Sequence, residues 1–504
     1  MMLAVRKWAI LIHRWMGVGF CVLFCSWFVS GMVLMYCPYP EIDGAERLER
    51  VGVIEPGEIL VDPQAAFGAT RSTGLPSQIR LNLLDGRPVY RFTFGRRSAI
   101  VRADTGEPVG NVSQEVALRI AASWTGLPAA AGSLDGLIET DDQWTLETSV
   151  LQYGPFWKFA WPNGEEVYVS QRSGEVMQAT TRGSRIGAYF GAIPHWLFFT
   201  PLRSRSGLWS QVVIWLSGAG TMLSILGLVI GIWVYSPSKS FRFPGGASSL
   251  PYVGPKRWHV ILGLFFGVIT CTWVFSGLMS MGPFAWVEDQ NQPNLGKVLR
   301  GNLLDIQAFH GKTPGAAIVQ ASASLQVKEL ELATVGDEGF YLATGDAGKS
   351  VMVPMAGNPR AAFTAEQILE IVKRGVAPAQ IAESRLVKEY DAYYLDRHNR
   401  LPLPVLYVQL DDAAKSAYYI DPRTAQVVES YGVRSRRGRW LYHGLHSFDL
   451  PWLYANRPSW DIVVLLLMSG GTALSVTSLI LAFRVIRRKF RPKRRSLPRT
   501  VNAL

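Results

Sequence analysis

Four long apolar runs interrupt an otherwise mixed polar sequence. Each run has at least 22 residues without Asp, Glu, Lys or Arg, and a helix needs about 20 residues to cross the hydrocarbon core of a bilayer. The runs are Trp15–Tyr36, Leu208–Tyr235, Val260–Trp286 and Ile462–Phe483. They predict four membrane-spanning helices in two pairs, and each pair encloses a large polar region.

The polar regions carry the patterns of small α+β modules. Short alternating or apolar runs separated by turn residues predict strands at Val89–Phe94, Ala99–Arg102, Lys158–Trp161 and Val167–Ser170. A capping serine and helical spacing predict a helix over Ser113–Trp124. The pattern predicts two such modules in each half of the chain.

The two halves resemble each other at fixed offsets. An offset of 246 matches the start of the first and third apolar runs, and an offset of 251 matches the segments that follow. The matched pairs include His13 with His259, Gly17 with Gly263, Trp27 with Trp273, Tyr168 with Tyr419, and His195 with His446. This self-similarity predicts a tandem duplication of one unit that consists of a helix, an external domain and a second helix.

The composition and the placement of charge limit the function classes. Hydrophobic residues make up 48% of the 504 residues and charged residues 18%, which excludes a disordered chain or a disulfide scaffold. The net charge is +12, and 16 Lys and Arg lie without Asp or Glu at the N-terminus, in the linker 236–257 and in the tail from Arg484. The positive-inside rule therefore predicts that both termini and the linker are cytoplasmic. The charge indicates topology and contact with anionic lipid, not a nucleic-acid partner.

The ends of the apolar runs and of the basic segments predict how the chain divides into membrane and extramembrane segments. It consists of a cytoplasmic N-terminus with the first spanning helix, two large external regions, three further spanning helices, a cytoplasmic linker and a basic cytoplasmic tail. In chain order the segments are 1–36, 37–207, 208–235, 236–257, 258–286, 287–459, 460–484 and 485–504.

The order of these motifs is similar to that of the PepSY-associated transmembrane family. The resemblance is carried by the helices with a His, a Gly four residues later and a Ser-Gly pair, by the "Leu-His…Gly-Thr" second helices, and by the "Tyr-Val…Ser-Gly-Glu-Val" strand–turn–strand units. It covers about residues 8–488. It implies a multi-pass protein of the bacterial inner membrane, with a four-helix bundle and two periplasmic PepSY-like α+β regions. It also implies iron-regulated relatives that reduce ferric siderophores and carry haem between their helices.

Four of the seven histidines form two duplicated pairs, His13 with His259 and His195 with His446. Equivalent residues of two related halves lie across a pseudo-twofold axis, and a flat cofactor on that axis would receive the same ligand from each half. Bis-imidazole ligation of haem iron has this geometry. We therefore expect these four histidines to be the axial ligands of two haem b groups, one near each face of the membrane.

Other residues are secondary candidates for contacts with the cofactor. Gly17 and Gly263 lie on the histidine faces of their helices, and His443 stands three residues before His446, although the alignment favours His446. His310 and His398 have no duplicate and are expected at the surface. Further candidates are Trp27 and Trp273 between the sites, and Arg203, Arg205 and Arg457 as cations near an anionic group. The structural alternative is ordinary helix packing by small residues and hydrogen bonds of boundary histidines.

The predicted function is a di-haem b-type oxidoreductase that passes electrons across the membrane to an external ferric siderophore or other Fe(III) chelate. No nucleotide-binding motif is found, and the cytoplasmic segments are too short to hold a nicotinamide or flavin nucleotide. The electrons would therefore come from membrane quinol or from a separate reductase. The alternative is a haem-free, membrane-anchored PepSY protein that binds or inhibits a peptidase or another partner.

Overall fold

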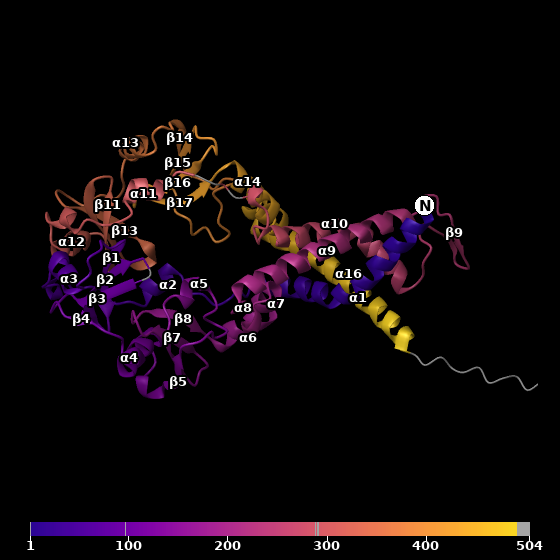
Figure 1. The fold of residues 1–504 in the computed structure, drawn as a ribbon, viewed down its shortest axis with the longest axis horizontal. Coiled ribbons are helices and arrows are strands. Elements are labelled where there is room, and N and C mark those ends of the chain that lie inside the picture. The colour runs from indigo at the N-terminus through magenta and orange to yellow at the C-terminus, as the bar shows by residue number, and fades with distance from the viewer. Residues whose placement is uncertain (1, 96, 288, 290–291, 491–504) are drawn as a thin grey trace, which may run out of the picture.

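Four long helices form one end of the molecule and a β-rich body forms the other (Figure 1). The structure, a computed structural model, describes residues 2–490 except 96, 288 and 290–291. The long helices are α1 (Met2–Leu34), α9 (Ser206–Val234), α10 (Pro255–Met279) and α16 (Arg457–Phe490). Each is long and apolar enough to cross a membrane, as the four apolar runs of the sequence predict.

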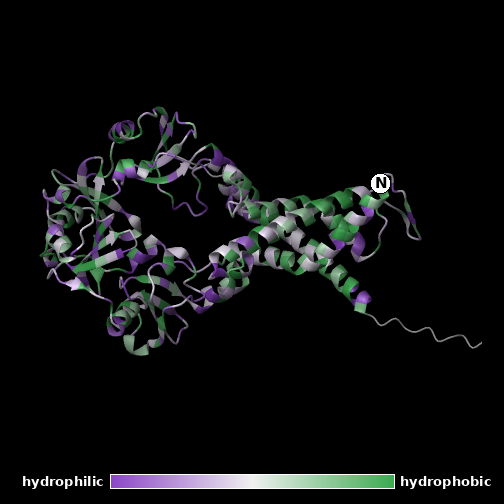
Figure 2. Cartoon of the chain, viewed as in Figure 1, coloured by the Kyte–Doolittle hydropathy of each residue, from purple (hydrophilic) through white to green (hydrophobic). Residues whose placement is uncertain are grey.

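The four helices pack as a bundle in which α9 lies on α10 and α1 lies on α16. Apolar residues dominate this end of the molecule, whereas polar and apolar residues mix in the β-rich body (Figure 2). The start of α1, the hairpin of β9 (Phe241–Phe243) and β10 (Gly246–Ser248), and the end of α16 all lie at the far end of the bundle (Figure 1). The basic segments of the sequence are therefore gathered at the end opposite the β-rich body.

The C-terminal ends of two long helices differ by several residues from the ends of the charge-free segments. The third apolar run continues to Trp286, but α10 ends at Met279 because Gly282, with φ of 55°, and Pro283 follow and cannot continue a helix. The last helix continues beyond 484 to Phe490, because Arg487, Arg488 and Lys489 in its final turn are good helix formers and favour a helix C-terminus.

A seven-stranded antiparallel sheet joins the two halves of the chain. Its strand order is β13-β12-β11-β1-β2-β3-β4. The bounds are β1 Gln78–Leu84, β2 Arg87–Phe94, β3 Arg97–Arg102, β4 Pro108–Val109, β11 Glu329–Val335, β12 Glu338–Thr344 and β13 Ser350–Pro354. The halves meet where β1 pairs with β11, with Ile79 opposite Leu332 and Leu81 opposite Leu330.

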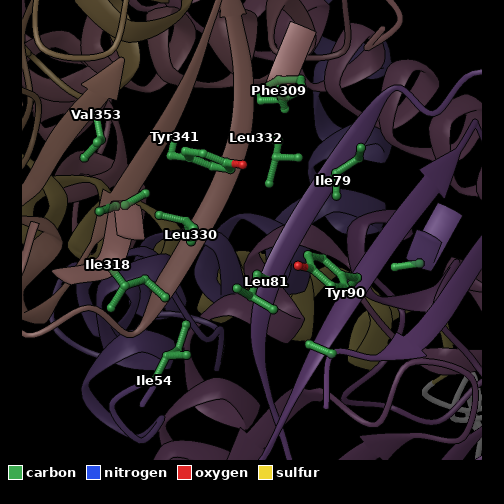
Figure 3. Packing of buried hydrophobic residues seen from close by; sticks show 14 of the residues in the cluster. Ile54, Ile79, Leu81, Tyr90, Phe309, Ile318, Leu330, Leu332, Tyr341 and Val353 are labelled. Carbon is green, nitrogen blue, oxygen red and sulfur yellow. The ribbon is translucent and has the colours of Figure 1, made fainter. Parts of the chain in front are cut away.

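One buried cluster covers this junction. Ile79 and Leu81 from the first half and Leu330 and Leu332 from the second are each at most 1% exposed, and they pack in one cluster that also includes Tyr90 and Tyr341 (Figure 3). Burying a side chain of this size contributes about 1.5–3 kcal/mol. The junction is therefore a single hydrophobic core and not a contact between two finished domains.

Each half also contains a four-stranded antiparallel meander. The first consists of β5 Ser133–Ile138, β6 Phe156–Ala160, β7 Glu166–Ser170 and β8 Val176–Thr180, and the second of β14 Ile381–Val387, β15 Val405–Leu410, β16 Ala417–Asp421 and β17 Gln426–Tyr431. Apart from β4 and α5, which have no counterpart, the order of sheets and main helices in the first half therefore recurs in the second. The structure confirms the predicted strands β2, β3, β6 and β7, although β6 ends at Ala160, one residue before the predicted end.

Short helices cover and connect the sheets. The predicted helix is α4, where the Ser113 side chain accepts a hydrogen bond from the Val116 amide and Gly126, with φ of 70°, ends the helix. The short helices are α2 Gly44–Glu49, α3 Pro63–Ala69, α4 Gln114–Thr125, α5 Thr148–Leu151, α6 Arg182–Phe190, α7 Ala192–Trp196, α8 Thr200–Arg203, α11 Leu295–Arg300, α12 Pro314–Ala321, α13 Ala365–Gly375, α14 Val433–Arg439 and α15 Pro451–Tyr454.

Candidate functional site

Two histidines lie side by side where the β-rich body meets the long helices. His195 is on α7, which packs against α1, and His446 follows a π-helical turn at Trp440–Gly444. Their ring centres are 6.0 Å apart. We call His195 and His446 the domain-side pair.

A second pair lies within the long helices, toward the far end of the bundle. His13 on α1 and His259 on α10 have ring centres 6.3 Å apart, with an angle of 43° between their planes. We call them the distal pair. The structure thus brings together the same histidines that the sequence offsets pair, although each pair comes from segments about 250 residues apart.

All four histidines use Nδ1 for a hydrogen bond to a long helix. The backbone carbonyl of Leu223 is 3.3 Å from Nδ1 of His13, and that of Trp27 is 3.1 Å from Nδ1 of His195. The hydroxyl of Thr477 is 3.1 Å from Nδ1 of His259, and the hydroxyl of Ser276 is 3.0 Å from Nδ1 of His446. A carbonyl or hydroxyl therefore orients every ring.

These partners define which ring nitrogen carries the proton. A carbonyl can only accept, so Nδ1 of His13 and His195 must donate. The hydroxyls of Ser276 and Thr477 already donate to helix carbonyls, at 2.9 Å and 2.6 Å, so they accept from the imidazoles. Within the described part of the chain, no hydrogen bond engages Nε2 of these four histidines. All four Nε2 lone pairs are therefore available to a ligand, as in histidines that bind metals.

The spacing of each pair fits an iron atom between the two rings. Two metal–nitrogen bonds of about 2.0 Å and two ring radii of about 1.1 Å place the ring centres about 6.2 Å apart. The observed separations are 6.0 Å and 6.3 Å. The donor set of two neutral imidazoles is one that haem iron accepts. The described residues hold no cluster of three or more His, Cys, Asp or Glu that could bind a bare metal ion.

The two pairs lie at different depths along the bundle. His13 and Trp27, whose carbonyl orients His195, are fourteen residues apart on α1, which corresponds to ~21 Å at ~1.5 Å per residue. Aromatic side chains occupy the intervening part of α1 and reach α10. Phe24 stacks on Trp27 with centres 6.0 Å apart, and Phe28 contacts Trp273 at 5.8 Å.

The domain-side pair lines a cavity of about 590 Å³, a volume typical of small-molecule and cofactor sites. Apolar and aromatic residues dominate its lining. The lining includes the repeated residues Trp27, Gly31 and Met35 from α1 and the segment after it, and Trp273, Gly277 and Met281 from α10 and the segment after it. The domain-side cavity is therefore built from both halves of the chain.

Glycines let the imidazoles lie against the helices. A Cβ at Gly31 would be 3.1 Å from Cε1 of His195 and 2.5 Å from the terminal methyl of Met468. A Cβ at Gly227 on α9 would be 2.8 Å from Cε1 of His13. Of the predicted glycine candidates, Gly17 has no atom within 4 Å of such a Cβ, and Gly263 has only Leu474 at 3.9 Å. These two positions leave space on the distal helices.

The electrostatics of the domain-side cavity favour neutral imidazoles. Burial lowers the pKa of His195 to about 4 and of His446 to about 3, so both rings are uncharged at neutral pH. The lining contains one carboxylate, Glu147, whose pKa is raised by burial. It also contains one guanidinium, Arg397, which reaches the cavity from the loop between β14 and β15.

The remaining predicted residues lie outside the cavity. His443 is exposed and does not line the cavity, and its Nδ1 is 4.0 Å from the carboxylate of Asp449. His310 and His398 are also exposed. Arg203 stacks on Phe198 and Trp209, two residues that line the cavity. Arg205 is exposed, and Arg457 forms an ion pair with Asp461 at 3.2 Å.

The fold and the site together define a multi-pass membrane protein with one β-rich body and with histidine pairs in and beside its helix bundle. Residues 10–329 match the family model described as the PepSY-associated TM region. The chain belongs to this PepSY-associated transmembrane family. The matched segment contains His13, His195 and His259. No curated protein matches the chain.

Several residues of the site were not predicted from the sequence. They are the oriented hydroxyls of Ser276 and Thr477, Gly227 against His13, and Arg397 in the cavity. A weak signal exists for Ser276, because the Ser30-Gly31 pair recurs as Ser276-Gly277. Arg397 has no such signal, since nothing in the sequence distinguishes it from Arg400 in the same loop.

Proposed function

We propose that this protein is a di-haem b-type membrane oxidoreductase built by tandem duplication, with its β-rich body in the periplasm and both termini in the cytoplasm. The observation that carries the proposal is the arrangement of the two histidine pairs. Each pair has ring centres 6.0–6.3 Å apart, and each ring has its Nδ1 held by a helix and its Nε2 free of hydrogen bonds among the described residues. The recurring element order of the two halves supports the duplication.

The chain's own residues would bind and orient two flat cofactors at different depths. Haem iron bound between the histidines of each pair would supply reversible one-electron Fe(III)/Fe(II) chemistry. The helix carbonyls and hydroxyls fix the imidazole tautomers, and the apolar lining of the domain-side cavity limits access of water. The aromatic contacts between the depths belong to the packed core of the bundle.

The acceptor that best suits this location is a ferric siderophore or another periplasmic Fe(III) chelate. One electron converts Fe(III) to Fe(II), and chelators with hard oxygen ligands hold Fe(II) much less tightly, so the iron is released. The electrons come from membrane quinol, which loses two electrons and two protons, or from a separate reductase. The described structure contains no nucleotide-binding α/β domain that could accept electrons from a nicotinamide.

Haem content tests the proposal directly. Membranes from cells that overproduce the full chain should show a Soret band and, after dithionite, an α band of b type. Purified protein should contain two haems per chain. If purified protein shows no haem absorbance after haem supplementation, the proposal is refuted. The result would then favour a haem-free membrane anchor for PepSY-like domains.

Histidine variants then distinguish the two sites. His13→Ala and His446→Ala should each remove about half of the haem, because each disrupts one pair. His310→Ala is the matched control, since His310 is exposed and far along the chain from both pairs. Complete loss of haem from either single variant would contradict two independent sites.

A further inference from the structure

The domain-side cavity contains hydrogen-bond donors without acceptors. Nε1 of Trp273 and Nε of Arg397 are buried, and neither has a hydrogen-bond partner among the described residues. Both residues line the cavity, and Trp273 is 93% buried because its exposed fraction is 7%. A buried donor without an acceptor destabilises the protein unless an occupant of the cavity pairs with it. The cavity is therefore built for an occupant that brings acceptor oxygens.

Arg397 is held in place by contacts that leave its charge unneutralised. Nη2 donates to the backbone carbonyl of Met35 at 2.6 Å, and the guanidinium lies 4.7 Å from the ring centre of Trp460. Within the described residues, Arg397 has no carboxylate within salt-bridge distance. The nearby carboxylate of Asp461 is already engaged by Arg457 and by the hydroxyl of Tyr36. The side chain is thus fixed and still carries a free positive charge.

The charge of Arg397 itself favours an anionic occupant of the cavity. Burial, together with the charge of Arg457, lowers the pKa of Arg397, which is the direction expected for a cation without an anion beside it. A guanidinium remains charged in a protein, and its fork geometry matches a carboxylate.

We infer that Arg397 is the residue that binds a carboxylate of the cofactor in the domain-side cavity, that is, a propionate of haem. This inference rests on the proposed function, because it names a residue for the same site. Arg397 belongs to the second β-rich half, so this contact would link that half to the site between the long helices. A fixed positive charge beside the domain-side site also favours the reduced state of the cofactor bound there.

A chemical double-mutant cycle tests the inference. The full chain in detergent is stripped of haem and titrated with haem or with haem dimethyl ester, whose propionates carry no charge. Arg397→Gln should weaken domain-side binding of haem roughly tenfold to a hundredfold, as expected for a charge-assisted hydrogen bond, and leave binding of the ester unchanged. In redox titrations the midpoint potential of the domain-side haem should fall in Arg397→Gln and stay near the wild-type value in Arg397→Lys.

Arg400→Gln is the matched control, because Arg400 lies in the same loop but is exposed and paired with Asp43 at 2.9 Å. It should affect haem and ester equally and only slightly. Equal weakening of haem and ester in Arg397→Gln would mean that Arg397 only positions Met35, and it would overturn the inference while the proposed function stands. Absence of any haem binding in the wild-type chain would overturn both.

Discussion

The substitution Gly227→Ala tests the geometry of the distal pair. The added Cβ would lie 2.8 Å from Cε1 of His13, whereas carbon atoms pack at about 3.5–4.0 Å. The imidazole would therefore have to move away from α9 by about 0.7–1.2 Å. Its Nδ1 bond to the carbonyl of Leu223, also on α9, is already 3.3 Å long and would be lost.

The expected effect is selective loss of the distal haem. Metal sites tolerate ligand displacements of only about 0.2 Å, and overpacking of this kind costs about 1–3 kcal/mol. That cost corresponds to roughly 5- to 150-fold weaker binding. Haem titration of the purified chain should show one site with wild-type affinity and one site weakened by this factor.

Gly218→Ala provides the control on the same helix. A Cβ at Gly218 would meet no atom within 4 Å, so under the proposed function this variant should keep the haem affinity of the wild type at both sites. If Gly227→Ala also binds two haems with unchanged affinity, His13 is not held against α9 as a ligand, and the reasoning for the distal site is refuted.

Three further predictions concern the domain-side site and the β-rich body. Ser276→Ala removes the acceptor of the His446 Nδ1 proton, so haem titration should show roughly 10- to 100-fold weaker binding at one site only. Although burial opposes ionisation, Arg80 and Arg91 hold the pKa of Glu175 at about 2, below its ordinary value of 4.5. The ionised carboxylate therefore stabilises the fold fully above about pH 4.5, and this contribution should be lost as the pH falls toward 2. Thermal unfolding across this range should show a smaller loss in Glu175→Gln than in the wild type. The variant should itself be about 3–5 kcal/mol less stable above pH 5, because the buried Arg91 loses its carboxylate partner. Leu332→Ala, at a position 1% exposed in the core that joins the halves, should cost about 2–5 kcal/mol in urea unfolding of the full chain, and an unchanged midpoint would contradict a shared core.

The main features of the membrane part could be predicted from the sequence. Hydrocarbon excludes charge and requires about 20 apolar residues per helix, so four charge-free runs indicate four helices without any knowledge of packing. The pairing of His13 with His259 and of His195 with His446 could also be expected, because a repeated unit places equivalent residues opposite each other. The strands of the first half follow from alternation and turn residues.

The joining of the two halves could not be predicted in this way. The register of β1 against β11 depends on backbone hydrogen bonds, which form between almost any two apolar strands, and on a core assembled from segments about 250 residues apart. The apolar patterns of β1 and β11 indicate only that each strand has a buried face.

The sequence by itself determined how many helices are long and apolar enough to cross a membrane and which histidines correspond. Only the tertiary structure decided how the rings of those histidines are oriented and which groups surround them. It turned each Nδ1 toward a carbonyl or hydroxyl of a long helix, placed Gly227 against His13, and brought Arg397 from a distant loop to the cavity of His195 and His446. The physical reason is that local patterns record burial and charge, whereas a binding site depends on distances between side chains that meet only after the chain has folded.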